Sequence, residues 1–235
     1  PDIEKARQVA EAFRPIVAKY LEENFNAKLL SIAPYPAQVL FSRDRITGLD
    51  DLKGKKIRAS GWTTAEFVKA LGATGVTLSF SEVPQALQRG VVDCAITGSL
   101  SGYSAGWGEV SDYIYPLPMG GWDHVIGCMN LDTWNSFSAQ EQKVIKDLIK
   151  EKLEEPAWKV TEDETLEGVA CLTGKSCPHG EPNELKEVEV TEEDIQTARN
   201  ILLEHVLPAW SSKVSATVVQ EWNETTGQVV NLKAE

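Results

Sequence analysis

The alternation of short extended and helical segments between residues 55 and 96 constrains the fold of this chain most. Residue types and apolar spacing predict strands at 55–59, 76–78 and 91–96, separated by helices at 63–71 and 81–89. Strands that alternate with helices at this spacing indicate βαβ units and a mainly parallel sheet. Ligands of such sheets bind at the carboxyl ends of the strands, so we expect the functional site at that edge.

Helical patterns flank this alternation on both sides. Apolar side chains recur at helical spacing through residues 2–24, and Ser138 with Glu141 forms a capping box that opens a long helix. A proline inside a helix lacks the N–H donor and crowds the preceding turn. We therefore expect Pro156 to kink the long helix and a later helix to stop near Pro208.

Composition excludes several classes of function. The 235 residues carry a formal net charge of −12, and no basic run is longer than Lys55-Lys56. Binding to nucleic acid or to an anionic membrane needs a concentrated basic patch, so neither partner is expected. No stretch approaches the roughly 18 consecutive apolar residues of a membrane span.

The four cysteines favour one disulfide. Cys171 and Cys177 flank Gly174 in a polar, turn-rich segment, where a short loop brings two thiols within bonding reach. A structural zinc is the alternative, but no two of the three histidines have helical ligand spacing, so we expect no metal. Cys94 and Cys128 lie in apolar runs and are expected to be small buried residues.

Several ordered motifs carry a family resemblance when taken together. They are Gly54 to Arg58, Leu71 to Ala73, Phe80 to Asp93, Leu207 to Trp210 and Trp222 to Gly227. With these motifs the chain resembles the solute-binding subunits of tripartite ATP-independent periplasmic (TRAP) transporters, of the dicarboxylate-binding type. The resemblance covers nearly the whole chain, although the chain begins at a helix that lies well inside the proteins of this family.

The resemblance implies an α/β fold of two lobes, with mainly parallel sheets and a long helix crossing both lobes. The first lobe is expected to be incomplete, because part of the usual chain is absent. We expect residues 1–35 and 124–162 in the first lobe, and residues 36–123 and 163–235 in the second.

The resemblance also implies a function without chemistry. Such a protein captures a small organic acid, including dicarboxylates, and delivers it to the membrane permease subunits of a TRAP transporter. It works as a periplasmic protein after removal of its signal peptide. We therefore expect no enzymatic activity, no cofactor and a monomer.

Arg58 matches the family arginine that clamps the carboxylate of the ligand. It ends a predicted strand, from which a side chain projects into a cleft. A guanidinium is a planar fork of donors that holds a carboxylate with two parallel charge-assisted hydrogen bonds. The alternative is an arginine in a surface ion pair.

Five further residues are expected around the same ligand. Phe80 matches a wall position and Thr97 a polar contact, while Gly98 offers a backbone N–H group where a helix opens. Trp62 and Trp122 fall near the cleft segments and would add apolar contact and shape. The alternatives are core packing for the aromatic residues and helix capping for Thr97.

Gln38 and Asp123 complete the expected ligand-binding set. Gln38 stands near a position where some family members, notably sialic-acid binders, carry a second basic residue. Its neutral side chain favours a simpler monocarboxylate or dicarboxylate ligand. Asp123 lies where the family's chain crosses between lobes, close to a ligand or a cation.

Two other functions compete with transport. Cys94 and His124 could form the nucleophile and base of a hydrolase, although no catalytic motif supports the pair. A sensor domain that uses the same fold to bind a ligand for signalling is the other alternative.

Overall fold

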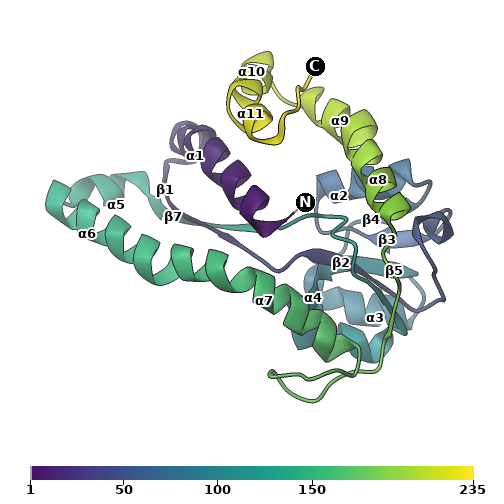
Figure 1. Cartoon of the computed structure of the whole chain (residues 1–235). Helices are drawn as coiled ribbons and strands as arrows, with labels where there is room; N and C mark the ends of the chain where they lie inside the picture. Colours follow the sequence, from purple (N-terminus) through teal and green to yellow (C-terminus); the bar gives the residue numbers. More distant parts are fainter. Residues whose placement is uncertain (1) are drawn as a thin grey trace. The chain divides into compact units, whose positions relative to one another are not determined.

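The fold is described by a computed structural model that places residues 2–235 (Figure 1). The chain separates into two compact units. Unit 1 comprises Pro1–Tyr35, Asp123–Glu162 and Val214–Glu235, and unit 2 comprises Pro36–Trp122 and Asp163–Lys213. This division differs from the expected lobes at Asp123 and at the tail from Val214 onward, which both belong to unit 1.

Unit 1 is built on a two-stranded antiparallel ribbon. Helix α1 (Ile3–Phe25) leads into β1 (Ala27–Pro34), which pairs with β7 (His124–Asn130). Asp2 caps the start of α1, and Asn26 ends it in the left-handed conformation. The small core of the unit joins Ala10 of α1 to Leu29 and Ile32 of β1 and to Trp158.

The tail contacts unit 1 through α1. Helices α10 (Ala216–Glu224) and α11 (Thr226–Val230) both pack against α1, and α5 (Leu131–Ser136) packs against the ribbon. The tail thus packs with unit 1, whereas the sequence analysis placed it in the second lobe. Side-chain periodicity identifies a helix but does not say which neighbour its apolar face will contact.

The long helix forms as predicted and supplies residues to both units. It consists of α6 (Ala139–Ile149), η4 (Lys150–Glu154) and α7 (Glu155–Leu172). The segment η4 is a π-turn immediately before Pro156, and the N–H of Glu155 bonds the carbonyl of Lys150. A π-turn widens the helix at the place where the proline removes a donor.

A second π-turn lies before Pro208, where the sequence predicted that a helix would stop. Helix α8 (Glu192–Ile201) continues through the π-turn η5 (Leu202–Val206) into α9 (Leu207–Ser211), so the helix does not stop there. Leu207 donates its N–H to the carbonyl of Leu202, five residues earlier. The widened turn accommodates Pro208, and the chain remains helical.

Unit 2 holds a six-stranded sheet in the order β4-β3-β5-β2-β6-β8. The strands are β2 (Gln38–Ser42), β3 (Lys56–Arg58), β4 (Thr74–Val76), β5 (Cys94–Gly98), β6 (Tyr113–Tyr115) and β8 (Lys186–Glu187). Neighbouring strands are parallel except at β2, which is antiparallel to both β5 and β6. The predicted mainly parallel sheet is confirmed.

Several strand boundaries differ from the predicted ones. β4 begins at Thr74 rather than at 76, and β5 begins only at Cys94. Val91 and Val92 donate their N–H groups to the carbonyl of Ala86, so both residues belong to the turn that leaves the preceding helix. Apolar character alone could not separate this turn from the strand.

Short helices cover both faces of the sheet. They are η1 (Leu49–Leu52), α2 (Trp62–Ala70), η2 (Phe80–Glu82), α3 (Val83–Gln88), α4 (Ser99–Ser104) and η3 (Trp107–Val110). Alternate residues of a strand face opposite sides. Leu40 accordingly packs with Phe67 of α2 in one core cluster, and Phe41 packs with Leu87 and Trp107 in the other.

The predicted disulfide is confirmed. Cys171 is buried near the end of α7 and is bonded to Cys177 in the loop that follows, with Gly174 at positive φ between them. Cys94 is buried as expected, whereas Cys128 is exposed on β7, contrary to expectation. Most residues of β7 are exposed, and within residues 2–235 β7 pairs only with β1.

A buried carboxylate connects three elements of unit 1. Glu154, in η4, accepts hydrogen bonds from the Arg14 guanidinium of α1 and from the backbone N–H of Ile32 in β1. The adjacent Glu155 pairs with Arg7, and both of those side chains are substantially exposed. The two neighbouring glutamates therefore form ion pairs in opposite environments.

We predict that Glu154→Ala lowers the free energy of unfolding by about 2 kcal/mol, because it leaves the buried Ile32 N–H without an acceptor and leaves Arg14 paired only with Glu11. The matched variant Glu155→Ala should cost at most about 1 kcal/mol, since exposed ion pairs contribute little. Denaturant titrations of both variants test the contrast. Equal losses would show that Glu154 does not connect α1, β1 and η4 as described.

We predict that Cys177→Ser lowers the free energy of unfolding by about 2 kcal/mol, because the bond closes a short loop and constrains the unfolded chain. Cys128→Ser, at an exposed free thiol, is the control and should unfold like the parent protein. Intact mass before and after reduction checks the bond itself. Alkylation of Cys171 and Cys177 without a reductant would contradict the assignment.

Candidate functional site

The direction of the strands gathers the predicted residues of unit 2 at one edge of its sheet. β3, β4, β5 and β6 point the same way, so their carboxyl ends share this edge. β2 runs in the opposite direction, and its first residue, Gln38, lies opposite Gly98 at the end of β5. We call this side of unit 2 the carboxyl edge.

Arg58 is the last residue of β3 and is 6% exposed. Its Nε donates to the carbonyl of Leu78 at 3.3 Å, and its Nη1 donates to the carbonyl of Ile96 at 2.8 Å. The guanidinium carbon lies 5.6 Å from the centre of the Trp107 ring. These contacts fix the plane of the guanidinium, and they are not those of a surface ion pair.

Phe80 follows β4 and lies beside the same tryptophan. Its ring centre is 5.2 Å from that of Trp107, and the residue remains 40% exposed. Core packing therefore does not account for the whole Phe80 ring. Trp107 brings Phe80 and Arg58 together on one face of the sheet.

Trp107 falls near the cleft segments in sequence but was not among the expected ligand-binding residues. It is fully buried between Gly106 and Gly108, and a side chain at Gly108 would collide with Asn183. The spacing Gly-Trp-Gly was the available signal, because glycines on both sides of a large ring allow the backbone to approach its neighbours closely.

Thr97 and Gly98 form the end of β5. Thr97 is largely buried and pairs with Val39, while Gly98 rather than Thr97 precedes α4 as its N-cap. Helix capping is therefore not the role of Thr97. The N–H of Ser99 bonds the carbonyl of Ala37, and α4 has only six residues, so an anion site at this helix start is not supported.

Gln38 reaches across the end of β5. Its Oε1 accepts a hydrogen bond from the Ser60 hydroxyl at 2.5 Å, two residues beyond Arg58. The backbone N–H of Gln38 bonds the carbonyl of Gly121, which brings Trp122 to the same edge. Gln38 and Ser60 thus link β2 to the segment that follows β3.

The two remaining residues, Trp62 and Asp123, make other contacts. Trp62 begins α2, and the Lys213 Nζ lies 4.9 Å from the centre of its ring. Asp123 is exposed and belongs to unit 1, where its carbonyl accepts the N–H of Tyr35. Within residues 2–235, no three His, Cys, Asp or Glu side chains gather as a metal site.

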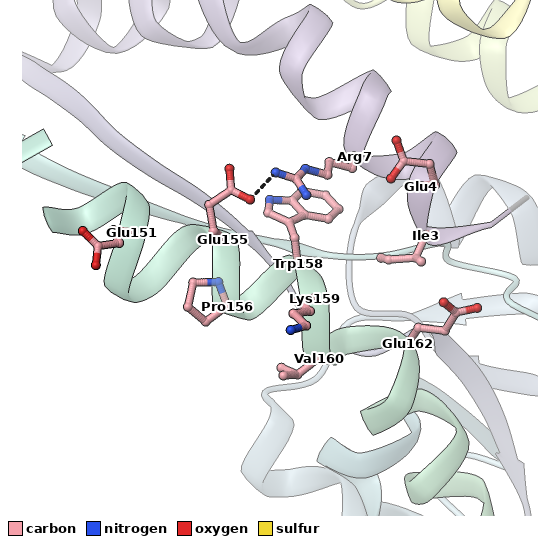
Figure 2. Close-up of a pocket in the computed structure, with 10 residues that line it drawn as sticks. All are labelled: Ile3, Glu4, Arg7, Glu151, Glu155, Pro156, Trp158, Lys159, Val160 and Glu162. Carbon is pink, nitrogen blue, oxygen red and sulfur yellow. Dashed lines mark hydrogen bonds and ion pairs between the residues drawn. The ribbon is translucent and has the colours of Figure 1, made fainter. Parts of the chain in front are cut away.

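A cavity of about 670 Å³ lies in unit 1 and includes none of the predicted residues (Figure 2). Four glutamates and only two basic residues, Arg7 and Lys159, line it. Arg7 already pairs with Glu155, toward which its guanidinium points in Figure 2. An excess of carboxylates makes this cavity unsuitable for an organic acid, so the carboxyl edge is the better candidate.

Cys94 lacks the properties of a nucleophile. It is fully buried in β5, and its thiol contacts the Ser42 hydroxyl at 3.3 Å. Burial raises the pKa of the Cys94 thiol to about 11. The thiol therefore stays protonated at neutral pH, whereas the thiolate is the nucleophilic form.

Known proteins resemble this chain along most of its length. The ectoine-binding periplasmic protein TeaA of Halomonas elongata is 24% identical over 226 residues, which are 96% of this chain and 59% of TeaA. The chain spans 36% and 59% of the lengths of two curated relatives that it matches.

Two solved structures share the fold. One is a TRAP periplasmic solute-binding protein from Desulfovibrio salexigens with bound orotic acid, at a TM-score of 0.83 and 19% identity, covering 97% of this chain and 71% of that one. The other is DctP7, an extracytoplasmic solute receptor of Bordetella pertussis that binds pyroglutamic acid. Its TM-score is 0.75 and its sequence identity 22%, and the match covers 98% of this chain and 70% of DctP7. These similarities confirm the expected two-lobed fold class.

A family model decides the relationship. The model described as DctP, bacterial extracellular solute-binding protein family 7, matches residues 1–202. This match covers the sheet, the carboxyl edge and the long helix, and it confirms the family that the sequence motifs indicated. The chain belongs to the DctP family of bacterial extracellular solute-binding proteins.

Proposed function

We propose that this chain is the ligand-gripping part of a periplasmic protein that captures a small organic acid for the permease subunits of a TRAP transporter. The family is one of extracytoplasmic solute receptors. Among the described residues, no helix has the length and apolar character to cross a membrane. The observation that carries the proposal is Arg58, an arginine held in a fixed plane at the carboxyl edge.

The surroundings of Arg58 suit a carboxylate clamp. Two backbone carbonyls and the face of Trp107 orient the guanidinium before any ligand arrives. Binding by a pre-oriented side chain loses less conformational entropy, which strengthens affinity. The exposed part of the Phe80 ring supplies apolar contact next to the charge.

The residues at the carboxyl edge also limit the size and class of the ligand. Related structures hold orotic acid and pyroglutamic acid, which are both small acids. Arg58 offers one positive centre, and Gln38 adds a neutral amide where a second basic residue would favour a larger, more acidic ligand. A small monocarboxylate or dicarboxylate fits this set best.

The protein binds its ligand without converting it. Cys94, the only nucleophile that the sequence suggested, is buried and protonated. Units 1 and 2 correspond in this proposal to the two lobes of the family fold, with the tail from Val214 onward assigned to the first lobe. The expectation of a monomer is retained as part of the proposal.

We predict that Arg58→Ala in the full-length gene product weakens organic-acid binding by roughly thirtyfold or more, because the buried carboxylate loses its charge partner. Arg58→Lys should rescue binding only partly, since an ammonium cannot form two parallel hydrogen bonds. Calorimetric titration with pyroglutamate, orotate and malonate measures the effect on whichever of these acids the parent protein binds.

Arg43→Ala is the matched control. Arg43 follows β2 at the opposite edge of the sheet, and its Nη1 donates to the carbonyl of Leu87 at 2.6 Å. This variant removes the same kind of backbone contact and should leave affinity unchanged. Circular dichroism confirms folding of each variant. An Arg58→Ala protein that is folded and binds as tightly as its parent would refute the clamp.

We predict that Cys94 resists iodoacetamide at pH 8 in the native protein, because its pKa of about 11 and its burial keep the thiol neutral and covered. Cys128 is exposed and should react, and Cys94 should react only after unfolding. Mass mapping of the labelled peptides gives the result. Rapid native labelling of Cys94, together with turnover of an acid that Cys94→Ala abolishes, would favour the hydrolase.

A further inference from the structure

Gln38 carries a buried donor that the described residues leave unpaired. The side chain is 1% exposed, and its Nε2 has no hydrogen-bond partner within residues 2–235. Its Oε1 is paired with the Ser60 hydroxyl, so only the donor end lacks a partner. Buried polar groups in native proteins are nearly always paired, and an unpaired one points to a missing water, ion or ligand.

The position of the Gln38 amide is set by its neighbours. At Gly120 an added Cβ would lie 3.1 Å from three atoms of the Gln38 side chain, so the chain passes closely over the amide there. The Ser60 hydroxyl bonds its other end. Gly120 and Ser60 therefore hold the amide in place at the carboxyl edge.

A second unpaired donor lies on the segment bonded to Gln38. The indole Nε1 of Trp122 is also buried without a partner within residues 2–235. Trp122 follows Gly121, whose carbonyl accepts the backbone N–H of Gln38. An indole N–H can only donate, and the free end of the Gln38 amide can only donate. Both groups therefore call for an acceptor.

Charge decides which acceptor fits. Neither an amide nor an indole carries a positive charge, and burying a second carboxylate against neutral donors is unfavourable. A carbonyl oxygen accepts without bringing a charge and has no hydrogen that must find an acceptor of its own. A neutral carbonyl oxygen is thus the best match for the Gln38 end of the carboxyl edge.

We propose that Gln38 is a specificity-determining residue that reads a neutral carbonyl oxygen on the acid held by Arg58. The chain then selects monocarboxylates that also carry an oxo or amide carbonyl over dicarboxylates and over plain acids. This inference rests on the proposed function, because Arg58 must hold the carboxylate. The indole N–H of Trp122 donates a second hydrogen bond to the same oxygen of the ligand.

The test compares matched acids on the full-length gene product. Two pairs differ by one carbonyl group, namely levulinate with valerate and pyruvate with propionate. A third pair, pyroglutamate with cyclopentanecarboxylate, differs by one ring amide, that is by a carbonyl and an N–H group. Glutarate represents the dicarboxylates. Calorimetric titration should give at least one carbonyl acid that binds tenfold or more tightly than its plain partner and than glutarate.

Two variants assign that preference to Gln38. Gln38→Leu should weaken the carbonyl acid tenfold or more and leave the plain acid within twofold. Gln38→Glu keeps the shape and the oxygen that Ser60 bonds, but it replaces the donor with an acceptor, so it should also abolish the preference. Gln88→Leu, at an exposed position of α3, is the control and should bind like the parent protein.

The outcomes separate this inference from the proposed function. Gln38→Leu and Gln38→Glu could alter thermal stability but leave the preference for the carbonyl acid intact. The Gln38 Nε2 then donates to a buried water, and the inference is overturned. Equal weakening of both members of a pair also overturns it, while the Arg58 clamp stands. If the parent protein binds neither an acid of this panel nor any acid used for Arg58, both proposals fail.

Discussion

The reversed direction of β2 is the constraint on which the carboxyl edge depends. β2 lies between β5 and β6 and is antiparallel to both, whereas the other neighbouring strands of the sheet are parallel. A strand that ran the other way would end at this edge instead of starting there. Because β2 starts at Gln38, the segment around residue 38 and the segment around residue 121 both meet the ends of β3 and β5.

The two polar anchors come from opposite faces of the sheet. Arg58 lies against Trp107, which belongs to the cluster of Phe41 and Leu87. Gln38 alternates with Val39 of that cluster and so lies on the other face, where Leu40 packs. Side chains from both faces meet only where the strands stop. A molecule at the carboxyl edge can therefore be held by a charge from one face and an amide from the other.

Sequence reasoning succeeded where local chemistry decides the structure. The strand–helix alternation, the capping box at Ser138 and the short loop between Cys171 and Cys177 are all specified by residues close in sequence. It failed where distant packing decides. The helix at Pro208 continues because a π-turn forms before it, and the tail packs on α1 because of an apolar face whose neighbour no local pattern names.

For the candidate site too, the sequence predicted individual residues but not the contacts between them. Motif positions identified Arg58 and Phe80. Trp107, the ring that connects them, lies beyond the motif, and its contacts with both residues come only from the fold. Gln38 was included in the predicted site because it stands near a position where some family members carry a basic residue. The unpaired donor emerges only from the fold, because hydrogen-bond satisfaction is a property of three-dimensional neighbours.

The two sheets differ in how their outermost strands meet the solvent. In unit 2 the edge strands β4 and β8 are only three and two residues long, which offers other chains almost no template for pairing. In unit 1, β7 is seven residues long, pairs only with β1 within residues 2–235, and exposes Val125 and Ile126 at 43% each. Long apolar edges recruit further strands. Among the strands of residues 2–235, β7 is therefore the edge at which self-association of this chain would begin.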